Sequence, residues 1–146
     1  MNLKKELGEI FKGELSDDKK TLHAYENDAS LFEVIPELVA SPYNVDDIKS
    51  IVSFVNKHKK NNPKLSITAR AAGTGMSGGS LNESIILDVT KHINHIDEIK
   101  ESSITVEPGV FYRDLERKTL QSNLLMPAYP ASKNLCAVGG IVSNNS

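Results

Sequence analysis

Hydrophobic residues recur at helical spacing in three stretches of the chain. Residues 2–12 carry apolar side chains three or four positions apart, which predicts a short amphipathic helix, followed by a charged turn at residues 16–20. The pattern over residues 45–55 is more regular, and Asn44 stands where a helix cap is expected. Residues 111–121 form the third predicted helix. The residues expected on its buried face are Phe111, Leu115 and Leu120.

Shorter hydrophobic stretches between these helices are typical of strands. Residues 36–42 are bracketed by prolines and should be extended, and residues 65–70 alternate apolar and polar, as a half-buried strand does. Residues 85–89 are apolar on both faces, which predicts a central strand. Residues 92–100 fit a helix or a strand edge, and residues 103–110 predict a strand followed by a turn. The order of elements indicates an α+β fold with helices packed on a sheet.

Residues 71–84, the glycine loop, join two of the predicted strands. Four glycines lie in this loop: Gly73, Gly75, Gly78 and Gly79. Their spacing satisfies G-x-G-x-x-G, but too few residues remain before Ile85 for the helix that a Rossmann dinucleotide site requires. The pattern of a P-loop is also incomplete, because Gly79 occupies the position of its lysine. Both nucleotide motifs are therefore excluded.

A strand-to-strand loop of this composition exposes many main-chain N–H groups. Glycines accept positive φ and lack a Cβ atom, so that consecutive amides can face one concavity and a bulky anion can approach closely. Side-chain donors are available from Arg70, Thr74, Ser77 and Ser80. Such a loop suits a diphosphate. The alternative is a flexible connection, although a short loop between strands gains little from slack.

The composition of the chain argues against some classes of function. The chain has 146 residues, 39% hydrophobic and 25% charged, with a net charge of -2 and no basic stripe, which argues against a nucleic-acid partner. We find neither a signal peptide nor a membrane span, and the single cysteine fits a cytoplasmic protein. The last residues, Ala137 to Ser146, contain a second small-residue segment, expected to be a compact turn. Its loop-like composition leads us to expect a longer protein.

Four segments together resemble a known family, the FAD-linked oxidases of the vanillyl-alcohol oxidase and p-cresol methylhydroxylase superfamily, within its glycolate oxidase and D-lactate dehydrogenase branch. The first segment holds Tyr25, Asp28, Ala29 and Ser30, which match Y-x-x-D-A-S. Residues 70–79 resemble the pyrophosphate loop R-G-x-G-T-x-x-S-G-G, and residues 106–110 resemble V-x-P-G-V. The fourth segment resembles P-D-P-S-S-x-x-x-C-T-x-G-G and runs through Pro130, Ser132, Cys136, Gly139 and Gly140.

The resemblance implies a fold, a cofactor and an activity. The fold is an FAD-binding domain of the PCMH type with two α+β lobes: an N-terminal helical segment at residues 1–24, a small lobe to about residue 87, and the start of a truncated larger lobe at residues 88–146. The cofactor is FAD. The residues that the resemblance and the glycine loop predict to bind it are Arg70, Ala72, Gly73, Thr74, Gly75, Met76, Ser77, Gly78, Gly79, Pro130, Ser132, Cys136, Gly139, Gly140 and Asn144.

By the same resemblance, the full protein is a flavin-dependent oxidoreductase that passes hydride from a 2-hydroxy acid, such as glycolate or D-lactate, to the flavin and then electrons to an unidentified acceptor. We assign no catalytic residue, because the family places those residues in later segments. The alternatives are a non-redox nucleotide-binding or scaffold module, or a fragment too short to bind FAD. Apolar surface left uncovered where the larger lobe is cut would favour self-association.

The chain departs from the family pattern at several positions. Tyr129, Ala131 and Ala137 replace an Asp, a Ser and a Thr of the fourth segment. Thr74 matches a position where covalent family members often carry His, which implies that FAD is held non-covalently.

For the other potentially reactive residues, a structural role is expected in place of a catalytic or metal-binding role. Cys136 could react, but a small buried thiol is expected. His92 and His95 could pair on a metal, but no further ligands complete a site apart from the acids Asp97 and Glu98, so surface histidines are expected. Asp28 is interpreted as the acceptor of an Asx or capping turn.

Overall fold

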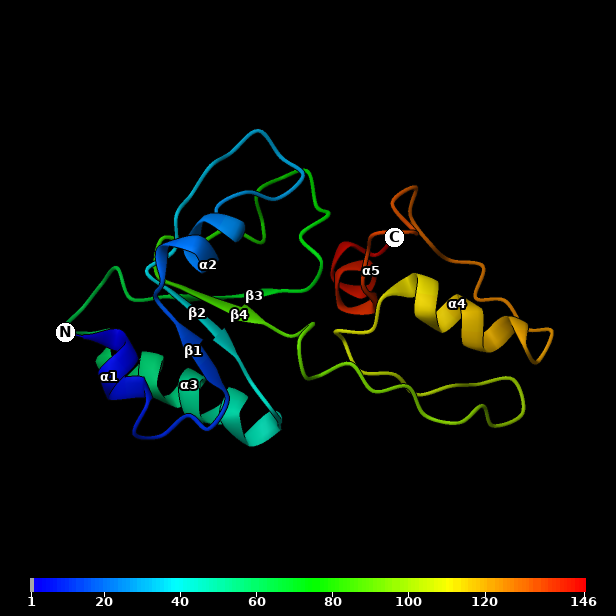
Figure 1. Cartoon of the computed structure of the whole chain (residues 1–146), viewed down its shortest axis with the longest axis horizontal. Coiled ribbons are helices and arrows are strands. Elements are labelled where there is room, and N and C mark those ends of the chain that lie inside the picture. The colour runs from blue at the N-terminus through cyan, green and yellow to red at the C-terminus, as the bar shows by residue number, and fades with distance from the viewer. Residues whose placement is uncertain (1) are drawn as a thin grey trace.

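A four-stranded sheet is built from residues 14–88 of the computed structural model, which describes residues 2–146 (Figure 1). Met1, where the predicted N-terminal segment begins, lies outside the described residues. The strands are β1 (Glu14–Ser16), β2 (Leu38–Ser41), β3 (Ile67–Arg70) and β4 (Ile85–Asp88), in the order β1-β2-β4-β3. Strand β1 is antiparallel to β2, whereas β2 and β3 both run parallel to β4. The three parallel strands therefore end at one edge of the sheet.

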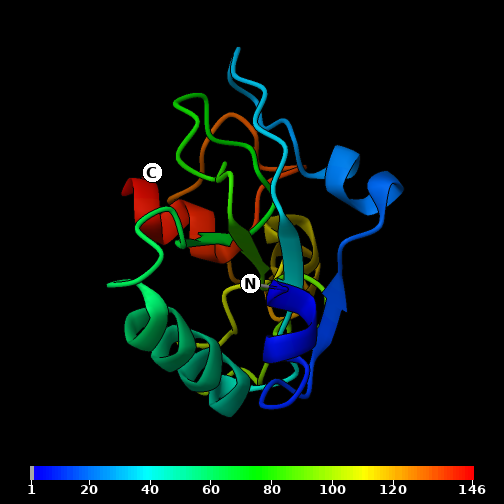
Figure 2. The ribbon, with the colours of Figure 1, turned by 90° about the vertical axis from the view of Figure 1, so that its left-hand side faces the viewer.

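Helices cover both faces of this sheet. Helices α1 (Leu3–Leu7) and α3 (Val45–His58) lie on one face and α2 (Lys19–Ala24) lies on the other, as the two perpendicular views agree (Figure 1 and Figure 2). The second half of the chain contains α4 (Tyr112–Leu120) and α5 (Val138–Asn144), joined by long irregular connections (Figure 1). Strands and helices together confirm the predicted α+β fold class.

The main hydrophobic core lies between the sheet and the pair α1 and α3. Alternate residues of each strand face it, because successive side chains of a strand point to opposite faces. Its buried members are Leu3, Leu7, Phe11, Leu38, Ala40, Ile51, Phe54, Val55, Leu65, Ile85 and Leu87. A second and much smaller cluster, in the C-terminal half, is built around Tyr112, Cys136 and Ile141. The larger cluster is thus the one between the sheet and the helices α1 and α3.

The longest helix and the central strand were predicted correctly. Helix α3 begins after Asn44, whose side chain accepts hydrogen bonds from the amides of Asp46 (2.9 Å) and Asp47 (3.1 Å), so the predicted cap is confirmed. Strand β4 is buried along its whole length and lies between two neighbours, as a central strand should.

Other expectations were wrong in extent or type. Helix α1 ends at Leu7, so Ile10 lies outside it and is 46% exposed. The region expected as a charged turn instead ends β1 and starts α2, two elements that we did not predict. Residues 92–110 form isolated bridges, Ile96 with Val106 and Lys100 with Ser103, instead of a strand.

The two C-terminal elements also differ from their predictions. Helix α4 buries Tyr112 and Leu115, whereas Leu120, expected on the buried face, is 54% exposed. The second small-residue segment is helix α5, not a compact turn.

Candidate functional site

Two segments far apart in the sequence line one cavity of about 320 Å³. One is the glycine loop, which leaves the carboxyl end of β3, and the other is helix α5, which faces that loop (Figure 1). A second cavity of about 310 Å³ adjoins the first, because four residues line both. These shared residues are Thr74, Gly75, Gly140 and Asn144.

Every residue predicted to bind the cofactor lines one or both cavities, with the exception of Gly78. Those that line the first cavity are Arg70, Ala72, Gly73, Thr74, Gly75, Ser77, Gly79, Gly139, Gly140 and Asn144. The second cavity adds Met76, Pro130, Ser132 and Cys136. Val89, Pro108 and Ser143 line the first cavity without having been predicted. Pro108 belongs to the V-x-P-G-V segment, so its place in the motif was the signal that could have revealed it.

The main-chain N–H groups of residues 72–79 have no hydrogen-bond acceptor within residues 2–146. The loop nevertheless has a specific backbone conformation. Gly73 (φ 66°) and Gly78 (φ 74°) adopt the left-handed conformation that glycine tolerates best. Arg70 is the sole charged side chain among the residues that line the first cavity. A row of free amides on a glycine-rich loop is a suitable partner for an anion.

The glycines around the cavity fall into two groups. At Gly73, Gly78 and Gly139 the protein itself leaves no space, because a Cβ atom would lie 2.6 Å from Arg70 Nη2, 2.8 Å from Phe32 Cδ2 and 2.9 Å from Pro108 Cβ. The second group is Gly75, Gly79 and Gly140, where a Cβ atom would meet nothing closer than 3.7 Å. Protein packing does not require glycine at these three positions. All three line the first cavity, where the missing Cβ atoms leave room for a ligand.

Helix α5 forms a wall of the cavity, but the first amides of this helix are already hydrogen-bonded within the protein. The amides of Val138 and Gly139 donate to the carbonyls of Val110 and Pro108, each at 2.8 Å. The amide of Gly140 donates to Ala137 O at 3.0 Å. The free donors of the site therefore belong to the glycine loop.

Arg70 is 9% exposed and holds a neighbouring segment. Its Nη1 and Nη2 atoms donate to the carbonyls of Tyr25 (3.2 Å) and Asn27 (2.7 Å). Burial lowers the pKa of the Arg70 guanidinium, while the nearby acidic groups Asp28 and Asp88 oppose this effect. The arginine remains a cation at neutral pH, since guanidinium groups in proteins keep their proton. Arg70 thus stabilises the fold through these hydrogen bonds and also lines the first cavity.

Tyr25 and Asp28 belong to the segment that Arg70 holds. Tyr25 binds this segment to the sheet, and Asp28 makes a hydrogen bond within the segment. The Tyr25 hydroxyl donates to Asp88 Oδ2 at 2.7 Å, and burial together with this carboxylate raises the pKa of Tyr25 above its ordinary value. Asp28 Oδ1 accepts the amide of Ser30 at 2.8 Å, which confirms the predicted Asx turn.

Cys136 is buried, as expected, and each of the two histidines lies beside an acid. Cys136 is buried beside Tyr112, and burial raises the pKa of its thiol. His92 Nε2 lies 2.7 Å from Glu14 Oε1, and His95 Nε2 lies 3.1 Å from Asp97 Oδ1, so the two rings bind separate acids. Across residues 2–146, no three metal-ligating side chains gather at one point.

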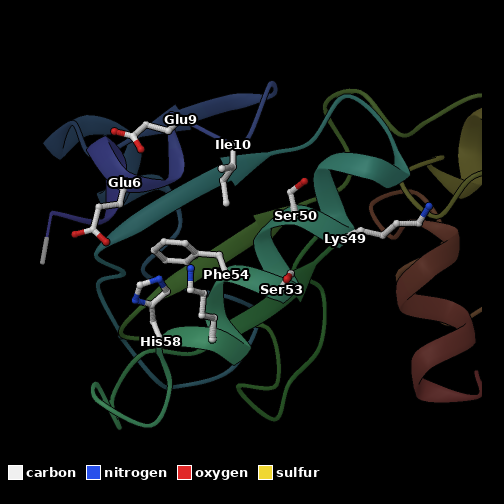
Figure 3. A pocket seen from close by; sticks show the side chains of 9 residues that line it. Glu6, Glu9, Ile10, Lys49, Ser50, Ser53, Phe54 and His58 are labelled. Atoms are coloured by element: carbon white, nitrogen blue, oxygen red, sulfur yellow. The ribbon is translucent and has the colours of Figure 1, made fainter.

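Another groove, of about 600 Å³, is lined by residues of α1, of the segment that follows it and of α3 (Figure 3). Glu6, Glu9 and Ile10 come from α1 and the residues that follow it, and Lys49, Phe54 and Lys57 come from α3. None of its residues borders the cavities at the glycine loop, so this groove is separate from the candidate site.

A family of known proteins matches this chain over residues 36–146, and its description is FAD binding domain. The chain belongs to this family. The resemblance drawn from the four motifs is thereby confirmed. Within residues 2–146 of this FAD binding domain, no helix has the length and apolar character needed to cross a membrane.

Curated relatives of the FAD binding domain include two enzymes. D-2-hydroxyglutarate dehydrogenase of Pseudomonas putida is 27% identical over 138 residues, which cover 93% of this chain and 14% of the relative. Glycolate oxidase subunit GlcD of Bacillus subtilis is 31% identical over 118 residues, which cover 79% of this chain and 24% of the relative. The chain thus spans a quarter or less of the length of these relatives.

A solved structure of p-cresol methylhydroxylase with substrate bound shares the fold. It superposes with a TM-score of 0.73 at 21% identity, covering 97% of this chain and 28% of that one.

Proposed function

We propose that this chain binds the diphosphate of FAD, within a protein that oxidises a 2-hydroxy acid. The observation that carries the proposal is the row of free N–H groups at residues 72–79, beside a cavity where three glycines leave open space. Neutral amide dipoles and one arginine offset the charge of a diphosphate without a basic patch. The net charge of -2 for the whole chain is compatible with such a local site.

The residues divide the binding of FAD between them. The amides of the glycine loop, with the hydroxyls of Thr74 and Ser77, hold the diphosphate, and Gly140 forms the opposite wall. Pro130, Ser132 and Asn144 border the adjoining cavity and orient the remainder of the cofactor. When bound, FAD supplies the two-electron redox chemistry, and the polypeptide positions it.

The substrate class rests on the relatives. Their names denote enzymes of 2-hydroxyglutarate and of glycolate, both of which are 2-hydroxy acids. We assign no catalytic residue and no electron acceptor within this chain. A cytoplasmic location belongs to the same proposal and is supported by the single cysteine.

FAD is held without a covalent bond in this proposal. Thr74 lines the cavity and matches the position where covalent family members often carry His, and burial raises the pKa of the Cys136 thiol. Acid precipitation of the FAD-loaded protein should therefore release all flavin absorbance into the supernatant. Flavin that remains with the precipitated polypeptide would contradict this part of the proposal.

The substitution Gly140→Ala tests the diphosphate site directly. Alanine at this helical position should raise the free energy of unfolding by about 1 kcal/mol, because alanine favours a helix more than glycine does. The added methyl group enters the cavity, and FAD affinity should fall about tenfold, equivalent to about 1.4 kcal/mol. Fluorescence titration with FAD measures the affinity, and thermal unfolding without FAD measures the stability.

Val142→Ala is the matched control, since Val142 lies on the same helix, is exposed and borders neither cavity. It should leave FAD affinity unchanged. If Gly140→Ala binds FAD as tightly as the unaltered protein, the proposed position of the cofactor is wrong.

A further inference from the structure

Residues 26–34 form a closed loop of their own beside the glycine loop (Figure 1 and Figure 2). The Val34 amide donates to Glu26 O at 2.8 Å, and Asn27 and Glu33 form an antiparallel bridge. Inside this 26–34 loop, the Ser30 amide donates to Asp28 Oδ1 at 2.8 Å. The loop is therefore ordered by its own hydrogen bonds.

The 26–34 loop contacts the glycine loop at three successive points. Near the start, the Ala29 amide donates to Gly73 O at 3.1 Å. In the middle, the ring of Phe32 occupies the space next to Gly78 that a Cβ atom would need. Farther along, Ser80 Oγ donates to Asp28 Oδ2 at 3.1 Å.

None of these contacts uses an N–H group of residues 72–79. They use a carbonyl oxygen of the glycine loop, a hydroxyl group and the open face of a glycine. The hydrogen bond from Arg70 to Asn27 O, just before the glycine loop, follows the same rule. A loop could be held in this manner and still present all its amides to a ligand.

We propose that the 26–34 loop is a brace that fixes the glycine loop before the cofactor binds, with Asp28 and Phe32 as its positioning residues. Neither residue lines the cavities, so both act through the glycine loop. A loop that holds the binding conformation only part of the time has an apparent dissociation constant raised in proportion. The nature of the ligand rests on the proposed function, whereas the ordering of the glycine loop does not.

The decisive measurement is ¹⁵N relaxation of the loop amides in the ligand-free protein. In the unaltered protein, the amides of Gly75, Gly78 and Gly79 should have order parameters of about 0.85, as in rigid backbone. In Asp28→Ala and in Phe32→Ala these values should fall below about 0.6, while those of α3 stay unchanged. Asp28→Asn keeps a side-chain oxygen that can accept the Ser30 amide, and it should restore most of the order.

Leu31→Ala is the control, because Leu31 lies in the same loop and is fully exposed to solvent. It should leave every order parameter as it is. Phe32 is 60% exposed, so its replacement does not open the hydrophobic core, and the signals of α3 and β4 verify folding in each variant.

FAD titration separates the failure of the brace from failure of the proposed function. If a variant populates the binding conformation one-tenth of the time, its apparent dissociation constant for FAD should rise about tenfold. A glycine loop that is mobile in the unaltered protein, or equally ordered in Asp28→Ala and Phe32→Ala, overturns the brace even if FAD binds. Ordering that depends on these residues supports the brace even if FAD does not bind.

Discussion

Tyr129 stands where the family motif has an aspartate, and its surroundings explain how the chain accommodates the change. The Tyr129 ring lies 5.2 Å from the ring of Tyr112, and the Lys133 ammonium lies 4.8 Å from its centroid. Lys133 also donates to Glu116 Oε1 at 2.9 Å, and this hydrogen bond raises the pKa of the lysine. Aromatic and cation–π contacts thus fasten residues 129–133 to α4. The wall of the second cavity is held by packing at this point.

Asp28 should make the stability of the protein depend on pH in the acid range. Burial raises the pKa of its carboxyl group, but hydrogen bonds from Ser30 and Ser80 and the charge of Arg70 lower it by more, so the net shift is downward. A carboxyl group whose pKa is depressed by folding contributes stability above its unfolded pKa of about 3.9, and this contribution is lost as the pH falls through the folded value.

The comparison of the unaltered protein with Asp28→Asn isolates this carboxyl group from other acids. The difference in unfolding free energy should be constant from neutral pH to about pH 5 and should shrink below about pH 4. Urea denaturation at a series of pH values measures it. A difference that does not change with pH would mean that the aspartate carries no stabilising charge.

At the scale of single elements, the cap of α3 gives a clear expectation. Asn44→Ala removes the acceptor for two amides of the first helical turn, and the free energy of unfolding should fall by about 1 kcal/mol. Asn44→Ser keeps a capping oxygen and should lose only part of this stability. Chemical denaturation measures both variants. Equal stability of Asn44→Ala and the unaltered protein would show that water replaces the cap at no cost.

Elements whose formation depends on local pattern could be predicted, and α3 is the best example. Its apolar residues recur every three or four positions and Asn44 marks its start, so both signals agree. Helix α5 gave the opposite signals, because two glycines and an asparagine disfavour a helix. It forms because Val138 and Gly139 donate to carbonyls of a distant segment, a tertiary effect that periodicity does not reveal.

In the candidate site too, local features could be predicted from the sequence, whereas contacts between distant residues could not. The glycines that form the site could be predicted from the motifs, and all of the predicted glycines except Gly78 line the cavities. The contacts behind the glycine loop could not be predicted, since Arg70 and Asn27 are 43 residues apart and meet only in the folded chain. Strand β1 was missed for a similar reason, because it has 3 residues and is defined by its pairing with β2.

At the scale of the whole molecule, the two halves differ in the size of their cores. The sheet, α1 and α3 enclose one cluster of eleven buried residues, whereas the cluster around Tyr112, Cys136 and Ile141 has three. Segments with few buried apolar contacts open more readily than the rest of a protein. The second half should therefore be the first part of this chain to unfold.

Native-state hydrogen exchange tests this expectation. The amides of α4 and α5 should exchange at least about tenfold faster than those of α3 and β4, which corresponds to an opening free energy lower by about 1.4 kcal/mol. Addition of FAD should slow exchange in α5 if the cofactor contacts that helix, because a ligand stabilises the state that binds it. Uniform exchange across all four elements would indicate that the two halves open together.

The hydrogen bond between Arg70 and Tyr25 spans 45 residues of sequence and has a consequence for the order of folding. Contacts between such distant positions form late, because closing a long stretch of chain costs entropy before any contact repays it. The strands must be aligned before the arginine can reach its carbonyl acceptors. We therefore expect the glycine loop to reach its final conformation only after the sheet has formed, and the proposed binding of FAD to follow that step.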